Sequence, residues 1–222
     1  MASRLHWIVL FLVLVGICTV GVWIAISSEP HQRKPTSVAT ITSTVARAPP
    51  FEQPESPFEC LSKAALAQVG VTTLYDPNYA ALAYPGGDVP LERGVCADVI
   101  VRAFRGVGID LQKMVHEDML ANFAAYPRRW NLKRPDANID HRRVLNLMTW
   151  FQRQGWELPI TSVSADYQVG DMVAWDLGNG LTHIGMVVKA NGKMTVVHNI
   201  GQGARMETVL FSWPQIGHYR WK

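Results

Sequence analysis

The chain has 222 residues, of which 48% are hydrophobic and 18% are charged, and its formal net charge at pH 7 is +3. This length suits one ordinary domain with extensions, and the hydrophobic content is sufficient for a sizeable core. The basic residues are dispersed along the sequence rather than gathered into a stripe, which argues against a nucleic-acid-binding protein.

The first 28 residues contain a long apolar segment. Residues 5–28 include no Asp, Glu, Lys or Arg, and about 20 apolar residues suffice to span a bilayer. Trp7 and Trp23 lie near the ends of the segment, as interfacial aromatic residues do. We expect residues 1–28 to be an uncleaved transmembrane anchor, with a cleaved signal peptide as the alternative because small residues follow the apolar stretch.

A tether is expected next. Residues 29–57 are rich in Pro, Ser and Thr and poor in large apolar side chains, a composition typical of flexible linkers. Such a tether suits a domain held near a surface outside the cytoplasm, although Arg4 on one side of the apolar segment and Arg33 and Lys34 on the other leave its orientation open. The folded domain is then expected over residues 58–222.

The first half of this domain carries the apolar periodicity of α-helices. Four helices are expected: over 60–69, from Cys96 to a stop at Gly106 and Gly108, from an Asp110 cap to just before Pro127, and from an Asp140 cap to Gly155. An irregular stretch with several turn signals separates the first two helices.

After residue 155 the sequence indicates β-structure, with strands expected over 172–175, 181–188 and 194–199. Asn191-Gly192 joins the last two and favours a two-residue type I′ turn. That turn would place His183 and His198 on one face of the sheet as diagonal neighbours. Gly185, opposite His198, would leave room between the two rings, and Asn199 would point to the other face.

Cys96 lies at the start of its helix, where the helix dipole and the unpaired N–H groups favour a thiolate and can hold a developing oxyanion. Together with the two histidines it forms a Cys-His-polar arrangement. We predict Cys96 as the nucleophile, His183 as the general base and His198 as the group that orients His183. This chemistry requires no cofactor and no metal.

Arg142 and Arg143 are expected in the first turn of the last helix, where a cation is unfavourable by about 0.3–1 kcal/mol. That position suggests that they bind an anionic group. The partner would be either a substrate carboxylate or an internal carboxylate such as Asp136 or Asp118. We predict His141 and Arg142 as substrate-binding residues.

Four separate motifs resemble those of the domain of unknown function 1287 family, which is placed beside the NlpC-type cell-wall peptidases: Gly94–Ile100, Asn138–Arg143, His183–Gly185 and Gly217–Arg220. The resemblance extends from about Cys60 to the C-terminus. It implies an α+β, papain-like (NlpC-type) domain, with N-terminal helices packed on a small antiparallel sheet.

The same resemblance implies a function and a location. NlpC-type enzymes have a cysteine at a helix start and histidines on two successive strands, which matches Cys96, His183 and His198. They cut amide bonds in peptidoglycan stem peptides, so a cell-wall peptide is the expected substrate. We expect a single-pass anchor in a bacterial inner membrane with the domain in the periplasm, or a secreted domain if the anchor is cleaved.

Two other classes of protein fit the same residues. Cys96, His183 and His198 could ligate zinc with an open position, as in a metal hydrolase. Alternatively, the domain could be a non-catalytic module that binds the cell envelope, with Cys96 buried or joined to Cys60 by a disulfide.

Overall fold

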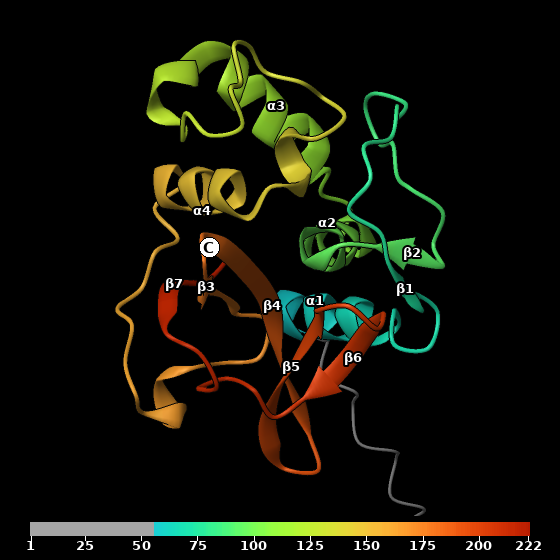
Figure 1. Cartoon of the computed structure of the whole chain (residues 1–222). Coiled ribbons are helices and arrows are strands. Elements are labelled where there is room, and N and C mark those ends of the chain that lie inside the picture. The colour runs from blue at the N-terminus through green and yellow to red at the C-terminus, as the bar shows by residue number, and fades with distance from the viewer. Residues whose placement is uncertain (1–55) are drawn as a thin grey trace, which may run out of the picture. The chain divides into compact units, whose positions relative to one another are not determined.

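The computed structural model describes residues 56–222 (Figure 1). The membrane anchor predicted at residues 1–28 therefore lies outside the described residues, as does almost all of the linker predicted at residues 29–57. Within the described part, no helix combines the length and the apolar character that crossing a membrane requires.

Four α-helices precede the main sheet in this part of the chain: α1 (Pro57–Leu66), α2 (Cys96–Gly106), α3 (Leu111–Asn122) and α4 (Val144–Arg153). Short 3₁₀ helices cover Phe123–Ala125, Asp140–Arg142 and Ser164–Asp166. Two-residue strands β1 (Leu74–Tyr75) and β2 (Arg93–Gly94) pair in parallel within the stretch that was predicted to be irregular.

The helix caps explain where the predicted boundaries hold and where they fail. The Asp110 cap is confirmed, since its side chain accepts the N–H groups of Gln112 and Lys113. Helix α1 begins three residues earlier than predicted, because Ser56 and Glu59 form a reciprocal capping box.

The predicted start of the last helix was wrong. Asp140 opens a 3₁₀ turn, and Arg143 is the N-cap of α4. Arg142 and Arg143 therefore precede the first turn of the α-helix, and the expected conflict with its dipole does not arise.

The main sheet has five strands, all antiparallel, in the order β6-β5-β4-β3-β7. They are β3 (Met172–Gly178), β4 (Leu181–Ala190), β5 (Lys193–Asn199), β6 (Ala204–Glu207) and β7 (Gln215–Tyr219). The predicted α+β class is thus confirmed as helices followed by an antiparallel sheet. The hairpin turn is confirmed as well: Asn191 and Gly192 have φ angles of 49° and 77°, and both central residues of a type I′ turn need positive φ.

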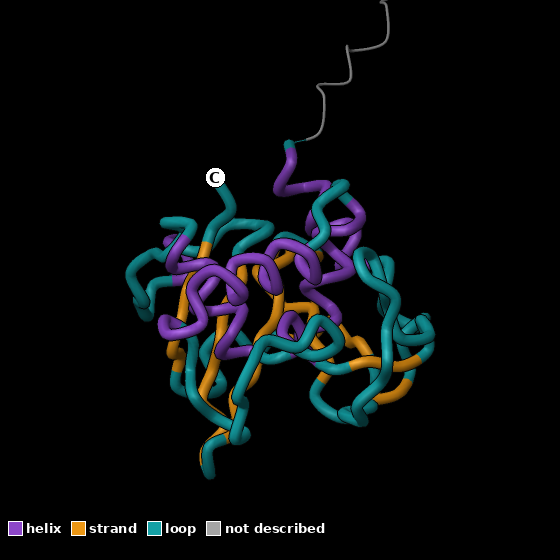
Figure 2. The backbone as a smooth tube through the Cα atoms, turned by 90° about the horizontal axis from the view of Figure 1, so that it is seen from above, coloured by secondary structure: helices purple, strands orange, loops and turns teal. Residues whose placement is uncertain are grey.

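The helices lie over one side of the sheet (Figure 2). Helix α2 contacts β4 and β5, and α4 contacts β4 and β7. Alternate strand residues face the two sides. Ala174, Ile184, Met186 and Val197 pack on the helical side, whereas Val173, Trp175, Val187 and Val196 pack on the other side with Tyr167 and Leu210. Helix α2 is the central helix of the domain, because nine of its eleven residues are buried.

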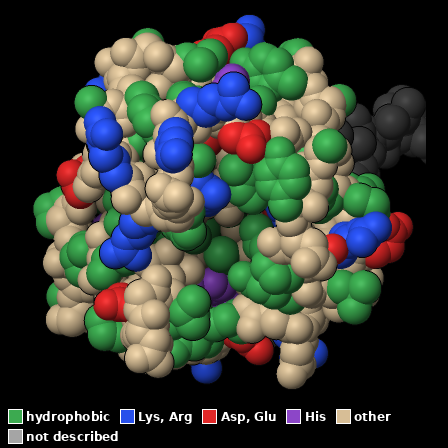
Figure 3. All heavy atoms as spheres, turned by 45° about the horizontal axis from the view of Figure 1, so that its top comes forward, with side chains coloured by type: hydrophobic (Ala, Val, Ile, Leu, Met, Phe, Trp, Pro, Cys, Tyr) green, Lys and Arg blue, Asp and Glu red, His purple; other side chains and the backbone are tan. Residues whose placement is uncertain are grey.

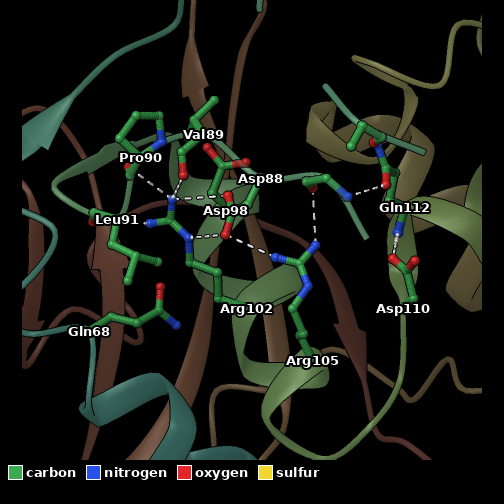
Figure 4. A network of polar contacts seen from close by, with 12 residues as sticks. Gln68, Asp88, Val89, Pro90, Leu91, Asp98, Arg102, Arg105, Asp110 and Gln112 are labelled. Atoms are coloured by element: carbon green, nitrogen blue, oxygen red, sulfur yellow. Dashed lines mark hydrogen bonds and ion pairs between the residues drawn. The ribbon is translucent and has the colours of Figure 1, made fainter. Parts of the chain in front are cut away.

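Two arginines of α2 fix the long segment that leads to Cys96 (Figure 4). Arg102 pairs with Asp88 through Nε at 2.9 Å and also donates to the carbonyl oxygens of Val89 and Arg93. Arg105 reaches the same carboxylate at 2.9 Å. Since Arg102 is buried, these bonds satisfy its guanidinium inside the protein and hold the segment onto α2.

Candidate active site

Cys96 is the first residue of α2, as predicted, and it is only 4% exposed. The carboxylate of Asp98 accepts the N–H of Val95 at 2.6 Å and so fixes the start of the helix. The side chain of Cys96 is therefore held by a rigid backbone within the core that α2 forms with the sheet.

The thiol lies in an environment with two opposing effects. Burial raises the pKa of the Cys96 thiol to about 11, whereas the main-chain N–H groups of Ile184 and Ala97 act to lower it. Burial is the larger effect, so the thiol is protonated at neutral pH in this structure. The helix start does favour the thiolate, as expected, but removal of the thiolate from water outweighs a dipole contribution of about 0.3–1 kcal/mol.

The two predicted histidines come together. Nε2 of His183 lies 2.8 Å from Nδ1 of His198, and both rings are buried. The strand register is the predicted one, because Met186 pairs with Val197. A Cβ atom built on Gly185 would lie 3.1 Å from Cβ of His198, so Gly185 leaves the room that was expected of it.

Glu207 extends this pair into a chain of three groups. Nε2 of His198 lies 2.9 Å from the Glu207 carboxylate, which accepts hydrogen bonds only. Burial lowers the pKa of His198. Burial, together with the repulsion that a protonated His198 would exert, lowers the pKa of His183 to about 3. Both rings are therefore neutral at pH 7.

The direction of these hydrogen bonds assigns the tautomer of each of the two histidines. His198 donates from Nε2 to Glu207 and accepts at Nδ1 from Nε2–H of His183. Nδ1 of His183 is left as an unprotonated base, and it makes no hydrogen bond within residues 56–222.

His183 and His198 face the side of the sheet away from α2: His183 pairs with Trp175 across β3 and β4 and stacks on its ring, and both histidine rings pack against Trp213. Cys96 lies on the α2 side, in the core that includes Ile184 and Val197.

The ladder between β4 and β5 stops at the Met186–Val197 pair, and beyond it the N–H of Ile184 acts on the Cys96 thiol. Ile184 directly follows His183 along the strand. Among the described residues no hydrogen bond joins Sγ of Cys96 to either imidazole. The space-filling view shows a hollow near the centre of the face drawn, with a histidine side chain inside it (Figure 3).

Arg142 is bound to an internal carboxylate. Its Nε and one terminal nitrogen lie 2.9 and 3.0 Å from the two oxygens of Asp98, and both side chains are buried. It also donates to the carbonyl oxygens of Asp76 and Asn78. The partner is thus neither Asp136 nor Asp118. The geometry favours an internal role for Arg142, in which it joins the start of α2 to the loop after β1.

His141 is separated from the other predicted site residues. It is 2% exposed, its Nδ1 has no hydrogen-bond partner within the described residues, and burial lowers its pKa to about 4. No described contact brings it to His183 or His198, so its predicted role in substrate binding gains no support from its position.

Two residues of this site were missed by the sequence analysis. Glu207 reaches His198 because His198 pairs with Arg205 across β5 and β6, which makes Glu207 its diagonal neighbour. Tyr75 pairs with Gly94 in the small parallel sheet. Its pKa is raised to about 12 by burial and by the nearby Cys96 and Asp98, so its phenol is a protonated donor close to the thiol. Neither strand pairing leaves a recognisable sequence signal.

The alternative roles of Cys96 can also be compared with the geometry. Within residues 56–222, no group of three or more His, Cys, Asp or Glu side chains is arranged to hold a metal ion. No disulfide joins Cys96 to Cys60 in the same range.

Comparison with known sequences identifies the family. The model described as "Domain of unknown function (DUF1287)" matches residues 62–221, which include the second half of α1 and all the other elements described above. An Escherichia coli (strain K12) protein with the name "Uncharacterized protein YijF" is 56% identical over 164 residues, which cover 72% of this chain and 80% of that protein. The chain belongs to the DUF1287 family.

Proposed function

We propose that this domain is a papain-like cysteine hydrolase that cleaves an amide bond. One observation carries the proposal: a buried thiol begins α2 and accepts the N–H of Ile184, while the neighbouring residue His183 begins the buried His183–His198–Glu207 hydrogen-bond chain on the other side of the sheet. A nucleophile at a helix start, with a base and an orienting group on successive strands, meets the requirements of covalent acyl transfer.

The reaction would proceed through an acyl-enzyme. The His183 ring, which packs against Trp175 in this structure, would have to turn to the α2 side of the sheet. Sγ of Cys96 would then attack the amide carbonyl carbon while Nδ1 of His183 takes the thiol proton. The N–H groups at the start of α2 stabilise the negative charge on the carbonyl oxygen. His183 then donates its proton to the leaving nitrogen, the C–N bond breaks, and a thioester remains. Water, activated by the same imidazole, hydrolyses the thioester and restores the thiol.

The resting state would be a neutral pair rather than a thiolate–imidazolium pair. The thiol pKa is about 11 and the His183 pKa is about 3, so proton transfer accompanies the attack on the carbonyl. His198 would hold His183 in the reactive tautomer, and the Glu207 carboxylate would stabilise the positive charge that forms on the two rings.

The proposed substrate class is the stem peptide of peptidoglycan. The resemblance to NlpC-type enzymes supports this class, because those enzymes cleave such peptides. The apolar segment at residues 5–28 supports action outside the cytoplasm. We place the domain in the periplasm of a bacterium, attached to the inner membrane by residues 1–28, with a secreted domain as the alternative.

Digestion of purified peptidoglycan by the full-length protein tests the hypothesis. Mass spectrometry should detect new peptide fragments with the wild type and with the matched cysteine control Cys60→Ala, but none with Cys96→Ala. Equal digestion by Cys96→Ala would refute a cysteine mechanism. Digestion by Cys96→Ser at the wild-type rate would refute it as well, because a serine hydroxyl lacks the nucleophilicity of the thiol.

Two alternatives make different predictions in the same assay. A zinc hydrolase that uses Cys96, His183 and His198 would lose activity in a chelator and recover it with added zinc. A non-catalytic envelope-binding module would retain peptidoglycan without releasing fragments, and its binding would be the same in Cys96→Ala. The cysteine mechanism predicts full activity in the chelator.

A further inference from the structure

The Asn138–Arg143 motif lies mostly apart from the candidate active site and borders a second cleft. This cleft has a volume of about 700 Å³, within the range of ligand-binding clefts. It is formed by three separate parts of the chain: Tyr79 in the loop after β1, His116 and Leu120 on α3, and residues 130–138. None of the residues assigned above to the hydrolytic reaction lines it.

His116 presents an oriented imidazole at this cleft. Its Nδ1 lies 2.9 Å from Oδ2 of Asp140, a fully buried carboxylate. The N–H of Asp136 donates to the same oxygen at 2.7 Å, so this oxygen acts as an acceptor and Nδ1 of His116 as a donor. Nε2 of His116 makes no hydrogen bond within residues 56–222 and remains available to a ligand.

The charged groups of the cleft favour an anion. Lys133 and Arg134 line it, both are exposed, and neither forms an ion pair with another described residue. Asp136 is the acidic residue in the lining, and its carboxylate already accepts the Tyr79 hydroxyl at 3.0 Å and the Asn138 N–H at 2.9 Å. Two cations therefore remain without a carboxylate partner in this part of the chain.

Aromatic surface borders the same cations. The Trp130 side chain lines the cleft and is 50% exposed, and the Arg143 guanidinium lies 4.3 Å from its ring centroid. Tyr79, also in the lining, is 60% exposed. Lys and Arg side chains gather on the upper part of the face drawn in Figure 3. Exposed aromatic rings beside unpaired cations suit a ligand that has both an anionic group and a less polar part.

We propose that this cleft binds an acidic peptide, with a carboxylate held by Lys133 and Arg134, a peptide N–H donated to Nε2 of His116 and the peptide chain against Trp130. The cleft is too large for a single small anion, which favours a ligand of several residues. The loop from Tyr75, beside Cys96, to Tyr79 connects the two sites. The binding proposal does not depend on hydrolysis, because none of its residues takes part in the proposed reaction.

Titration calorimetry on the full-length protein in a Cys96→Ala background tests this site without turnover. The probe is an acetylated tetrapeptide with two glutamates and a free C-terminal carboxylate. Its counterpart has glutamines and a C-terminal amide. We expect the acidic peptide to bind at least 10-fold more tightly than the amide counterpart, and the double variant Lys133→Met/Arg134→Met to weaken acidic-peptide binding by at least 10-fold. His116→Asn should weaken it several-fold.

The matched control is Lys189→Met/Lys193→Met, which removes two exposed cations from the β4–β5 hairpin and should leave the affinity unchanged. Equal binding of the acidic and amide peptides would overturn the proposal. So would equal weakening by the control variant, or binding of inorganic phosphate with no binding of the peptide. Lys133 and Arg134 are exposed, so their substitution is compatible with folding, which a thermal melt of each variant verifies.

Discussion

Nε2 of His183 lies 2.8 Å from Nδ1 of His198, and this contact determines which nitrogen of His183 can act as a base. Two imidazoles in such contact share one proton, so the direction of donation depends on the group beyond them. Glu207 is that group, 2.9 Å from Nε2 of His198. Because a carboxylate only accepts, every proton in the chain points towards Glu207, and Nδ1 of His183 is left unprotonated.

Substitutions of Glu207 should therefore act on the tautomer of His183. Glu207→Lys replaces the acceptor by a donor and reverses the chain, so that Nδ1 of His183 becomes protonated. We expect kcat to fall by about 10²- to 10⁴-fold, the range that general acid–base catalysis contributes. Glu207→Gln retains an acceptor oxygen and should cost less than about 10-fold. Kinetics on peptidoglycan fragments and ¹⁵N spectra of the histidines measure the two effects.

The side chain of Glu207 is 39% exposed, so both variants are compatible with folding, and a thermal melt verifies this. Equal activity of Glu207→Lys and Glu207→Gln would contradict the tautomer argument. A loss of activity with unchanged ¹⁵N histidine shifts would contradict it too.

The reactivity of Cys96 should follow its raised pKa. With a pKa of about 11, the thiolate fraction increases about tenfold for each pH unit between pH 7 and pH 10. We expect the rate of alkylation of Cys96 by iodoacetamide to increase in the same proportion, since the thiolate is the reacting form. Peptide mapping by mass spectrometry separates this labelling from that of the other cysteines, and Cys96→Ala serves as the blank.

A rate that levels off below pH 8 would disagree with this expectation. It would indicate a thiolate–imidazolium pair in solution, formed by an approach of Cys96 to His183 that is closer than in this structure. Complete resistance to alkylation at pH 10 would indicate that the buried thiol is inaccessible, which would weigh against the proposed nucleophile.

The strand pairing that brings the histidines together could be predicted from the sequence, because it depends on local chemistry. Asn191 and Gly192 select one turn type, and the period of two along a strand then assigns every side chain to a face. The position of Cys96 at a helix start was predictable for the same reason, since an apolar period of 3.6 residues begins there.

The remaining partners depend on contacts between segments far apart in sequence. Arg142 binds Asp98 across 44 residues, and no local pattern distinguishes Asp98 from the other acidic residues as its partner. Tyr75 approaches Cys96 through a pair of two-residue strands, which are too short to leave a periodic signal. The effect of burial on the Cys96 pKa likewise depends on the packing of the whole core and not on the start of α2 alone.

Arg142 should behave as a structural residue rather than as a ligand of substrate. Removal of one partner from a buried ion pair leaves an uncompensated charge and typically costs about 3–5 kcal/mol. We expect Arg142→Met to lower the free energy of unfolding by about this amount. The double variant Asp98→Asn/Arg142→Met should cost less than the sum of the two single variants. Urea denaturation of the four proteins gives the coupling energy directly.

The substrate-binding alternative predicts a different result for the same variant. If Arg142 bound a substrate carboxylate, Arg142→Met would raise KM and leave the unfolding transition near its wild-type position. Additive effects of the two single substitutions would also contradict the ion pair.

Buried neutral histidines should make the domain sensitive to acid. Burial lowers the pKa of His141 to about 4, and burial with the charge of His198 lowers that of His183 to about 3, whereas both groups have a pKa near 6.5 in the unfolded chain. Since the folded values are depressed, the unfolded state binds more protons below pH 6.5, and stability falls as the pH decreases. Each group contributes up to about 1.4 kcal/mol per pH unit between pH 6 and pH 4.5. Urea titrations across this range measure the slope of the unfolding free energy against pH. His141→Phe should reduce that slope by up to about 1.4 kcal/mol per pH unit, whatever its effect on stability at pH 7. An unchanged slope in that variant would show that His141 is not a buried neutral group.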